Sequence, residues 1–219
     1  MDRLGQLSFS ETLTPIPAET VNAWTHGFGW GLSVIASAAL MRTVITQGDW
    51  LTTIGCGVYA ASLVALYATS TLSHSIAHPP RRSLFRMLDQ ICIFLLISGS
   101  YTPFLMAHSR TVAGWTLLAV MWALTFVGVA VRLRTGDQPV AVAWYVALAW
   151  LPVLILGQVH SLTGLTGLTY VIAGGLAYVI GLWFFVNDHK HPYFHALWHC
   201  CVIVGTGLHF LFHYRYVII

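Results

Sequence analysis

The chain has 219 residues, of which 57% are hydrophobic and only 8% are charged, whereas a soluble domain usually carries about a quarter charged residues. This composition excludes a water-soluble globular protein and predicts an all-α, polytopic membrane protein with a single domain over residues 1–219. The formal net charge of +3 is small and its basic residues are scattered, which excludes a basic surface for nucleic acid. Membrane lipids are the expected partners.

Apolar stretches of roughly 20 residues, the length that crosses a bilayer core, recur along the chain. Before them, residues 1–20 are polar and lack the apolar core of a cleavable signal peptide, so a cytoplasmic N-terminal segment is expected there. Connections rich in Pro, Gly, Asp and Arg separate the apolar stretches. The sequence predicts a seven-transmembrane-helix bundle with spans at about residues 22–45, 50–74, 86–107, 111–133, 139–157, 164–187 and 193–216.

Prolines mark two features of this pattern. The run at 78–82, HPPRR, is expected to form a loop between the second and third spans. The fifth span is short and contains Pro152, which a membrane helix tolerates where neighbours satisfy the freed carbonyl.

The basic residues predict the orientation, because cytoplasmic loops carry an excess of Lys and Arg. With the N-terminus in the cytoplasm, the inner side holds Arg3, Arg81, Arg82, Arg86, Arg132, Arg134 and Lys190, and the outer side holds Arg42, Arg110 and Arg215. This bias favours a cytoplasmic N-terminus and an external C-terminus.

Ionisable groups inside membrane spans are costly and mark functional sites. The seventh span holds two histidines at a spacing typical of metal ligands. His195 and His199 lie four residues apart, so one helical face presents both imidazoles, the spacing by which one helix offers two nitrogens to a metal ion. The segment is not the HExxH motif, because Ala196 stands where that motif has Glu. Spacing alone leaves His191 as an alternative partner of His195.

Further polar residues are expected at the same depth in the membrane as His195 and His199, near its cytoplasmic side. Ser70 and His74 share a face near the cytoplasmic end of the second span, and Asp89 lies about one turn into the third. The first span begins on this side too, with polar residues along one face: Glu19, Asn22 and His26. Taken singly each residue has a structural explanation, such as an Asp89–Arg86 pair. Together they predict a zinc site in this leaflet, because three imidazole nitrogens plus a water form an open, catalytic pattern.

The remaining histidines and the cysteines are expected to have structural roles. His213 lies about 20 Å from His199 at a rise of ~1.5 Å per residue, too far to bind the same ion, so His209 and His213 are expected to pack or form hydrogen bonds. Three others fall in predicted loops: His108, His160 and His189. The four cysteines lie in apolar runs without a CxxC pair and are predicted to be small buried residues.

Four motifs occur in a fixed order along the chain: residues 19–26 (ETVNAWTH), 70–74 (STLSH), 88–90 (LDQ) leading into 99–103 (GSYTP), and 195–199 (HALWH) followed by His209-Phe210. Together they resemble the haemolysin III branch of the progestin and adiponectin receptor family. The resemblance implies a seven-helix fold unrelated to G-protein-coupled receptors, a cytoplasmic N-terminus, a bacterial inner membrane and zinc near the cytoplasmic side. It favours His199 over His191, and implies a site built from Ser70, His74, Asp89, His195 and His199.

Members of that family are linked to zinc-dependent lipid amide hydrolysis, to membrane-fluidity homeostasis and, by name, to haemolysis. The leading hypothesis is a hydrolase of a lipid-like amide or ester in which His74, His195 and His199 hold Zn²⁺. Asp89 would orient or deprotonate water and Ser70 would hydrogen-bond to that water or to the developing oxyanion. The alternative is a non-enzymatic membrane-homeostasis or receptor-like protein with structural zinc. A pore-forming haemolysin is disfavoured, because so apolar a chain with short loops offers no charged lumen.

Overall fold

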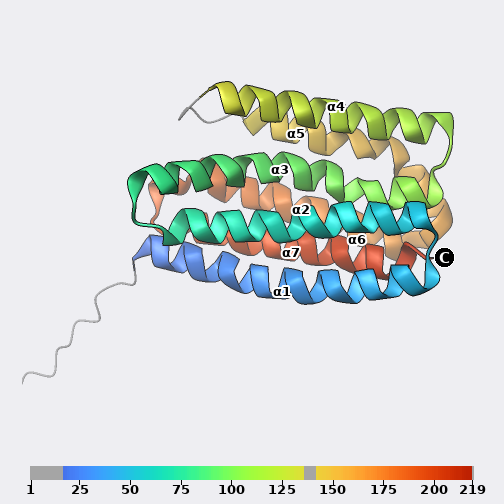
Figure 1. Ribbon diagram of the computed structural model, residues 1–219, viewed down its shortest axis with the longest axis horizontal. Coiled ribbons are helices and arrows are strands. Elements are labelled where there is room, and N and C mark those ends of the chain that lie inside the picture. Colours follow the sequence, from blue (N-terminus) through green and yellow to red (C-terminus); the bar gives the residue numbers. More distant parts are fainter. Residues whose placement is uncertain (1–16, 136–141, 219) are drawn as a thin grey trace, which may run out of the picture.

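The computed structural model describes residues 17–135 and 142–218, and within these residues it is helical and contains no strand, which confirms the all-α prediction (Figure 1). The elements in chain order are α1 Ala18–Gln47, α2 Trp50–Ser75, α3 Pro79–His108, α4 Val112–Arg134, α5 Val142–Trp150, the 3₁₀ helix η1 Leu151–Ile155, α6 Leu156–Val186, the 3₁₀ helix η2 Asp188–Lys190 and α7 Phe194–Tyr216.

Six helical stretches of the described chain are long and apolar enough to cross a membrane, which identifies an integral membrane protein. Five correspond to the first four predicted spans and the last. The remaining stretch, Val142–Val186, has 45 residues and covers both the predicted fifth and sixth spans. At ~1.5 Å per residue it would extend ~68 Å, about twice the ~30 Å hydrocarbon core. Six membrane-capable stretches are therefore observed where seven spans are predicted.

This long stretch is interrupted twice. It becomes a 3₁₀ helix at Leu151–Ile155, where Pro152 lacks the N–H that an α-helix needs. At Gly164 the backbone has φ 66° and ψ −167°, a region open to glycine and strained for residues with a side chain. The part before these breaks, α5, contacts α3 and α4, whereas α6 packs along α7 (Figure 1). The chain thus passes from one side of the bundle to the other within this stretch.

The predicted loop at residues 78–82 is helical from Pro79 onward, so the expected start of the third span at residue 86 is wrong. Two prolines occupy the first turn of α3. Proline is tolerated there, because the first N–H groups of a helix have no intrahelical acceptor and the fixed φ of proline is helical. The early start places Arg82 and Arg86 on α3, beside the start of α1 and the end of α2. There Arg82 Nε donates a hydrogen bond to the Ile76 carbonyl at 3.0 Å.

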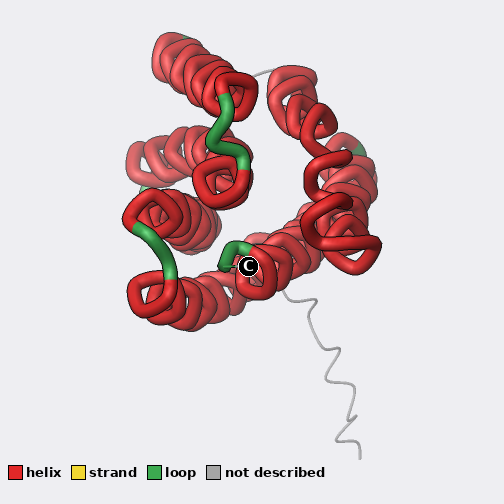
Figure 2. Tube along the Cα trace, turned by 90° about the vertical axis from the view of Figure 1, so that its right-hand side faces the viewer, coloured by secondary structure: helices red, strands yellow, loops and turns green. Residues whose placement is uncertain are grey.

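The packing of α2 brings together the end of the bundle that holds His74, His195 and His199, called the functional end below. Helix α2 lies between α1 and α3, and α1 also contacts α7. A buried cluster that includes Leu40 of α1, Tyr59 and Tyr67 of α2, and Val202 of α7 joins these helices. Figure 2 views the helices roughly end on and shows short connections between neighbouring helices. The start of α1, the end of α2 and the starts of α3 and α7 therefore meet at one end.

At the opposite end, Asp49 ties two helix termini together. Its carboxylate accepts a hydrogen bond from the Thr52 N–H at 2.8 Å, which caps α2, and it pairs with Arg110 just after α3. These two partners, the Thr52 N–H first, lower the pKa of Asp49 from 3.8 to about 2. The ionised carboxylate therefore stabilises this turn above pH 3.8, and the stabilisation is lost as the pH falls through about 2.

Candidate metal centre

Three predicted ligands come together at the functional end. His74 from α2 and His195 and His199 from α7 each offer one ligand atom, and these atoms all lie within 4.8 Å of one another. The ring of His74 is 5.1 Å from each of the other two rings, which are 4.7 Å apart. Nitrogens bound to tetrahedral zinc at ~2.0–2.1 Å are ~3.4 Å apart, so small ring movements would complete the site. The donor set fits zinc.

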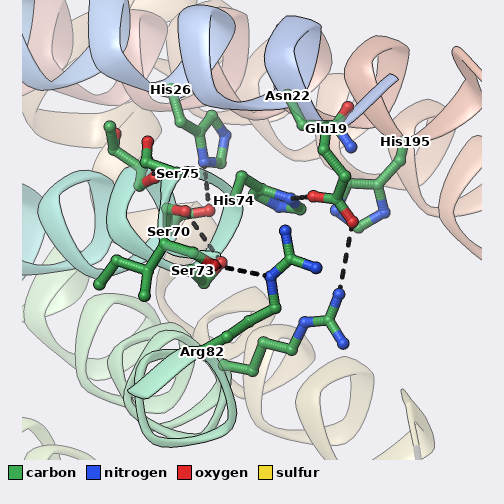
Figure 3. A network of polar contacts seen from close by, with 12 residues as sticks. Glu19, Asn22, His26, Ser70, Ser73, His74, Ser75, Arg82 and His195 are labelled. Atoms are coloured by element: carbon green, nitrogen blue, oxygen red, sulfur yellow. Dashed lines mark hydrogen bonds and ion pairs between the residues drawn. The ribbon is translucent and has the colours of Figure 1, made fainter. Parts of the chain in front are cut away.

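Glu19, in the first turn of α1, holds the His74 ring (Figure 3). Its Oε2 lies 2.6 Å from His74 Nδ1, and its Oε1 accepts a hydrogen bond from Arg86 Nη2 at 3.4 Å. A carboxylate at Nδ1 keeps the ring proton there and leaves Nε2 as the acceptor that can face a metal. Glu19 therefore orients His74 from a helix that contributes no ligand of its own.

The two histidines of α7 are held in the same way. His195 Nδ1 lies 3.2 Å from Asp188 Oδ2, which belongs to the short helix η2. His199 Nδ1 lies 3.0 Å from Thr25 Oγ1 and 3.3 Å from the carbonyl oxygen of Asn22, both on α1. With Nδ1 in use, all three rings keep Nε2 for a shared ion, an arrangement typical of histidines that bind metals.

Ser70 and Asp89 lie behind the histidines. The buried Ser70 hydroxyl is 2.7 Å from His26 Nδ1 and forms a hydrogen bond with the carboxyl of Asp89. His26 in turn stacks on His199, with ring centroids 3.5 Å apart. Ser70 and Asp89 thus reach the histidine group through His26, and in this arrangement the Ser70 hydroxyl is engaged by protein partners.

The sequence predicts that the polar face of α1 lies at this level but indicates no role for its residues. The signal was the spacing of Glu19, Asn22 and His26, which repeats on one face at the depth of the predicted ligands. The sequence pattern does not indicate that Thr25 or Asp188 contacts the histidines. Asp188 lies in a turn whose geometry is not encoded by helical periodicity.

The start of α7 at Phe194 separates the positions of His191 and His199. His191 is exposed and precedes Phe194, the first residue of α7, and its Nδ1 accepts a hydrogen bond from the Tyr193 N–H at 3.2 Å. His199 is buried and belongs to the group of three. Of the two, only His199 therefore lies in the histidine group.

The expected hydrogen bonds of the distant histidines are confirmed. His213 Nε2 donates to the Ser100 carbonyl at 2.7 Å, and His209 Nε2 lies 3.3 Å from the Val171 carbonyl. The prediction that His108 and His160 lie in loops is wrong, because His108 ends α3 and His160 lies within α6.

The predicted burial of all four cysteines is wrong at one position. Cys56 and Cys92 are buried, Cys201 is partly buried and Cys200 is exposed. Cys200 follows His199 directly on α7, so the buried face of the helix turns away from it.

The sequence is similar to haemolysin III proteins along most of its length. A family model described as "Haemolysin-III related" matches residues 15–210. Hemolysin-3 of Bacillus cereus is 36% identical over 198 residues, which cover 89% of this chain and 90% of that protein. The corresponding values are 29% over 197 residues (89% and 92%) for the Hemolysin-3 homolog of Bacillus subtilis (strain 168) and 26% over 203 residues (90% and 83%) for human Monocyte to macrophage differentiation factor. The chain therefore belongs to the haemolysin III-related family.

Proposed function

We propose that the protein is a zinc-dependent hydrolase of a lipid-like amide or ester, with a role in membrane homeostasis. The observation that supports this function is the make-up of the histidine group. Within residues 17–135 and 142–218, three nitrogens converge and no carboxylate or thiolate joins them. Structural zinc sites are closed by a fourth protein ligand, whereas catalytic sites keep a position for water. The open group therefore favours catalysis over a structural role.

The residues around the histidines have distinct proposed roles. Zinc held by His74, His195 and His199 would polarise a carbonyl and lower the pKa of a bound water toward ~7. Asp89 is the proposed general base, which accepts a proton from the attacking water and returns it to the leaving amine or alcohol. Ser70 holds the Asp89 carboxyl through their hydrogen bond and can turn its hydroxyl toward a developing oxyanion.

We also infer seven membrane crossings with a cytoplasmic N-terminus, in a bacterial inner membrane. The length of the 142–186 stretch and its break at Gly164 support two crossings there. Most of the described basic residues lie at the histidine end of the bundle: Arg81, Arg82, Arg86, Arg132, Arg134 and Lys190. Reporter fusions at the two termini should read inside and outside respectively, and an external N-terminal reporter would contradict this topology.

The hydrolase proposal is tested by metal-dependent product release. Purified protein in mixed micelles is expected to release fatty acid from a panel of N-acyl and O-acyl lipids, measured by mass spectrometry. Removal of the metal with a chelator should abolish release and added Zn²⁺ should restore it, because the ion supplies the Lewis acid. If protein with about one zinc per chain releases no fatty acid from any lipid of the panel, the result contradicts the hydrolase and supports structural zinc.

A further inference from the structure

A groove between α1 and α2 opens beside the candidate metal centre. It is an open groove of about 730 Å³, a volume within the ~300–1,000 Å³ of typical small-molecule sites. His74 lines this groove and is also one of the three grouped histidines. The exposed rings of Trp24 and Phe28, 63% and 65% accessible, form its outer wall. The groove therefore connects the apolar outer surface of the bundle with the histidines.

The lining of the groove changes from charged to apolar along α1. Its charged end holds Glu19, His74 and Arg82. Beyond them the α1 residues are small or aromatic: Ala23, Trp24, Gly27 and Phe28. A Cβ atom at Gly27 would meet only the Thr71 methyl group, at 3.6 Å, an ordinary contact. The lining of the groove thus matches the polarity of an amphiphile, charged at one end and largely apolar along α1.

Arg82 lies at the charged end of the groove (Figure 3). Its Nε is anchored on the Ile76 carbonyl, and its two terminal nitrogens make no hydrogen bond to the described part of the chain. The acidic residue of the groove, Glu19, is already bound to His74 and Arg86. The Glu19 carboxylate attracts this guanidinium electrostatically, but its two terminal nitrogens still offer parallel donors, the geometry that binds phosphate.

We propose that the groove binds an anionic phospholipid of the surrounding bilayer, with its phosphate on Arg82 and one acyl chain along Ala23 and Gly27. This proposal rests on the proposed function and names its substrate class. The acyl ester of a phospholipid lies between phosphate and chain, and along α2 His74 lies between Thr71, which faces Gly27, and Ile76, which anchors Arg82. Hydrolysis breaks the acyl carbon–oxygen bond: water gives its hydroxyl to the acyl carbon and its proton, through Asp89, to the glycerol oxygen. The products are a fatty acid and a lysophospholipid.

Lipid binding by native mass spectrometry tests the groove without any need for turnover. The full chain in detergent is titrated with phosphatidylglycerol or phosphatidylcholine of identical acyl chains. The wild-type protein is expected to prefer phosphatidylglycerol, and Arg82→Gln should weaken that binding about tenfold, the effect of losing a charge-assisted hydrogen bond. Arg81→Gln removes the same charge from an exposed neighbour outside the groove and should bind as the wild type does.

A second pair of variants tests the tail of the groove. Gly27→Leu fills this part of the groove and should weaken the binding of both lipids equally. Gly31→Leu, one turn along α1 in open space, should leave the binding of both lipids unchanged. Equal losses in Arg81→Gln and Arg82→Gln, or unchanged binding in Arg82→Gln and Gly27→Leu, would overturn the proposal. Retained, Arg82-dependent phosphatidylglycerol binding without fatty acid release would count against the hydrolase proposal alone.

Discussion

The His195→Ala/His199→Ala protein is expected to purify without zinc, where the wild-type chain carries about one ion. The double variant leaves His74 as the last member of the histidine group, and one imidazole does not hold the ion against buffer and water. Metal content is measured by inorganic mass spectrometry on untagged protein, with size-exclusion chromatography and circular dichroism to show that the bundle is intact.

The matched control for this variant removes two imidazoles from the same region. His189 and His191 are exposed and lie outside the group of three, so His189→Ala/His191→Ala should retain zinc. Zinc that persists in the first double variant, or disappears from the second, would show that the ion binds elsewhere. Loss of folding together with zinc in the first variant would favour a structural role for the ion.

Variants of Glu19 and Asp188, the carboxylates that contact the histidines, should weaken zinc binding to different extents. Glu19→Ala is expected to lower the affinity about 10–100-fold, the usual effect of removing a carboxylate that orients a metal-bound histidine. Asp188→Ala should have a smaller effect, because its oxygen is 3.2 Å from His195 whereas that of Glu19 is 2.6 Å from His74. Competition with a zinc chelator measures both, and Thr20→Ala serves as the neutral neighbour of Glu19.

Asp89→Asn should lower the rate of hydrolysis about 10²–10⁴-fold, the typical contribution of a general base, while the protein keeps its zinc. The amide has nearly the same shape as the carboxylate and still accepts a hydrogen bond from Ser70, so the variant removes the basic group and little else. The measurement pairs the rate of fatty acid release with metal content. Asp49→Asn, which loses a carboxylate at the far end of the bundle, controls for the change in charge and should keep the wild-type rate.

Two results would contradict this role of Asp89. A wild-type rate in Asp89→Asn would show that another group accepts the proton. Loss of zinc in the same variant would identify Asp89 as a ligand, which closes the site and favours the structural alternative.

The approach of His74, His195 and His199 could be predicted because it depends on two quantities that a sequence contains. Helical spacing places His195 and His199 on one face, and the distance of each residue from the end of its span gives its depth. The partners of Nδ1 depend instead on how α1 is rotated about its axis. In lipid a helix is apolar on most sides, so the pattern of apolar residues does not fix that rotation.

The errors in helix boundaries have a common physical origin. The proline run at residues 78–82 is expected to break the helix, but the effect of a proline or a glycine depends on its position. At Pro79 a proline opens a helix, because no hydrogen bond is lost in the first turn. Gly164 interrupts the backbone inside a stretch that remains helical on both sides. Only the three-dimensional path shows which of these outcomes occurs.

The contact between Asn22 and His199 joins residues 177 positions apart, and this separation governs how the protein is synthesised. At ~5–20 residues per second, α7 leaves the ribosome roughly 10–35 s after α1. During that interval the polar groups of α1 and α2 enter the bilayer without the histidines of α7. The first two helices therefore wait beside the insertion machinery or shield each other, through pairs such as Glu19–His74 and His26–Ser70, until the last helix arrives.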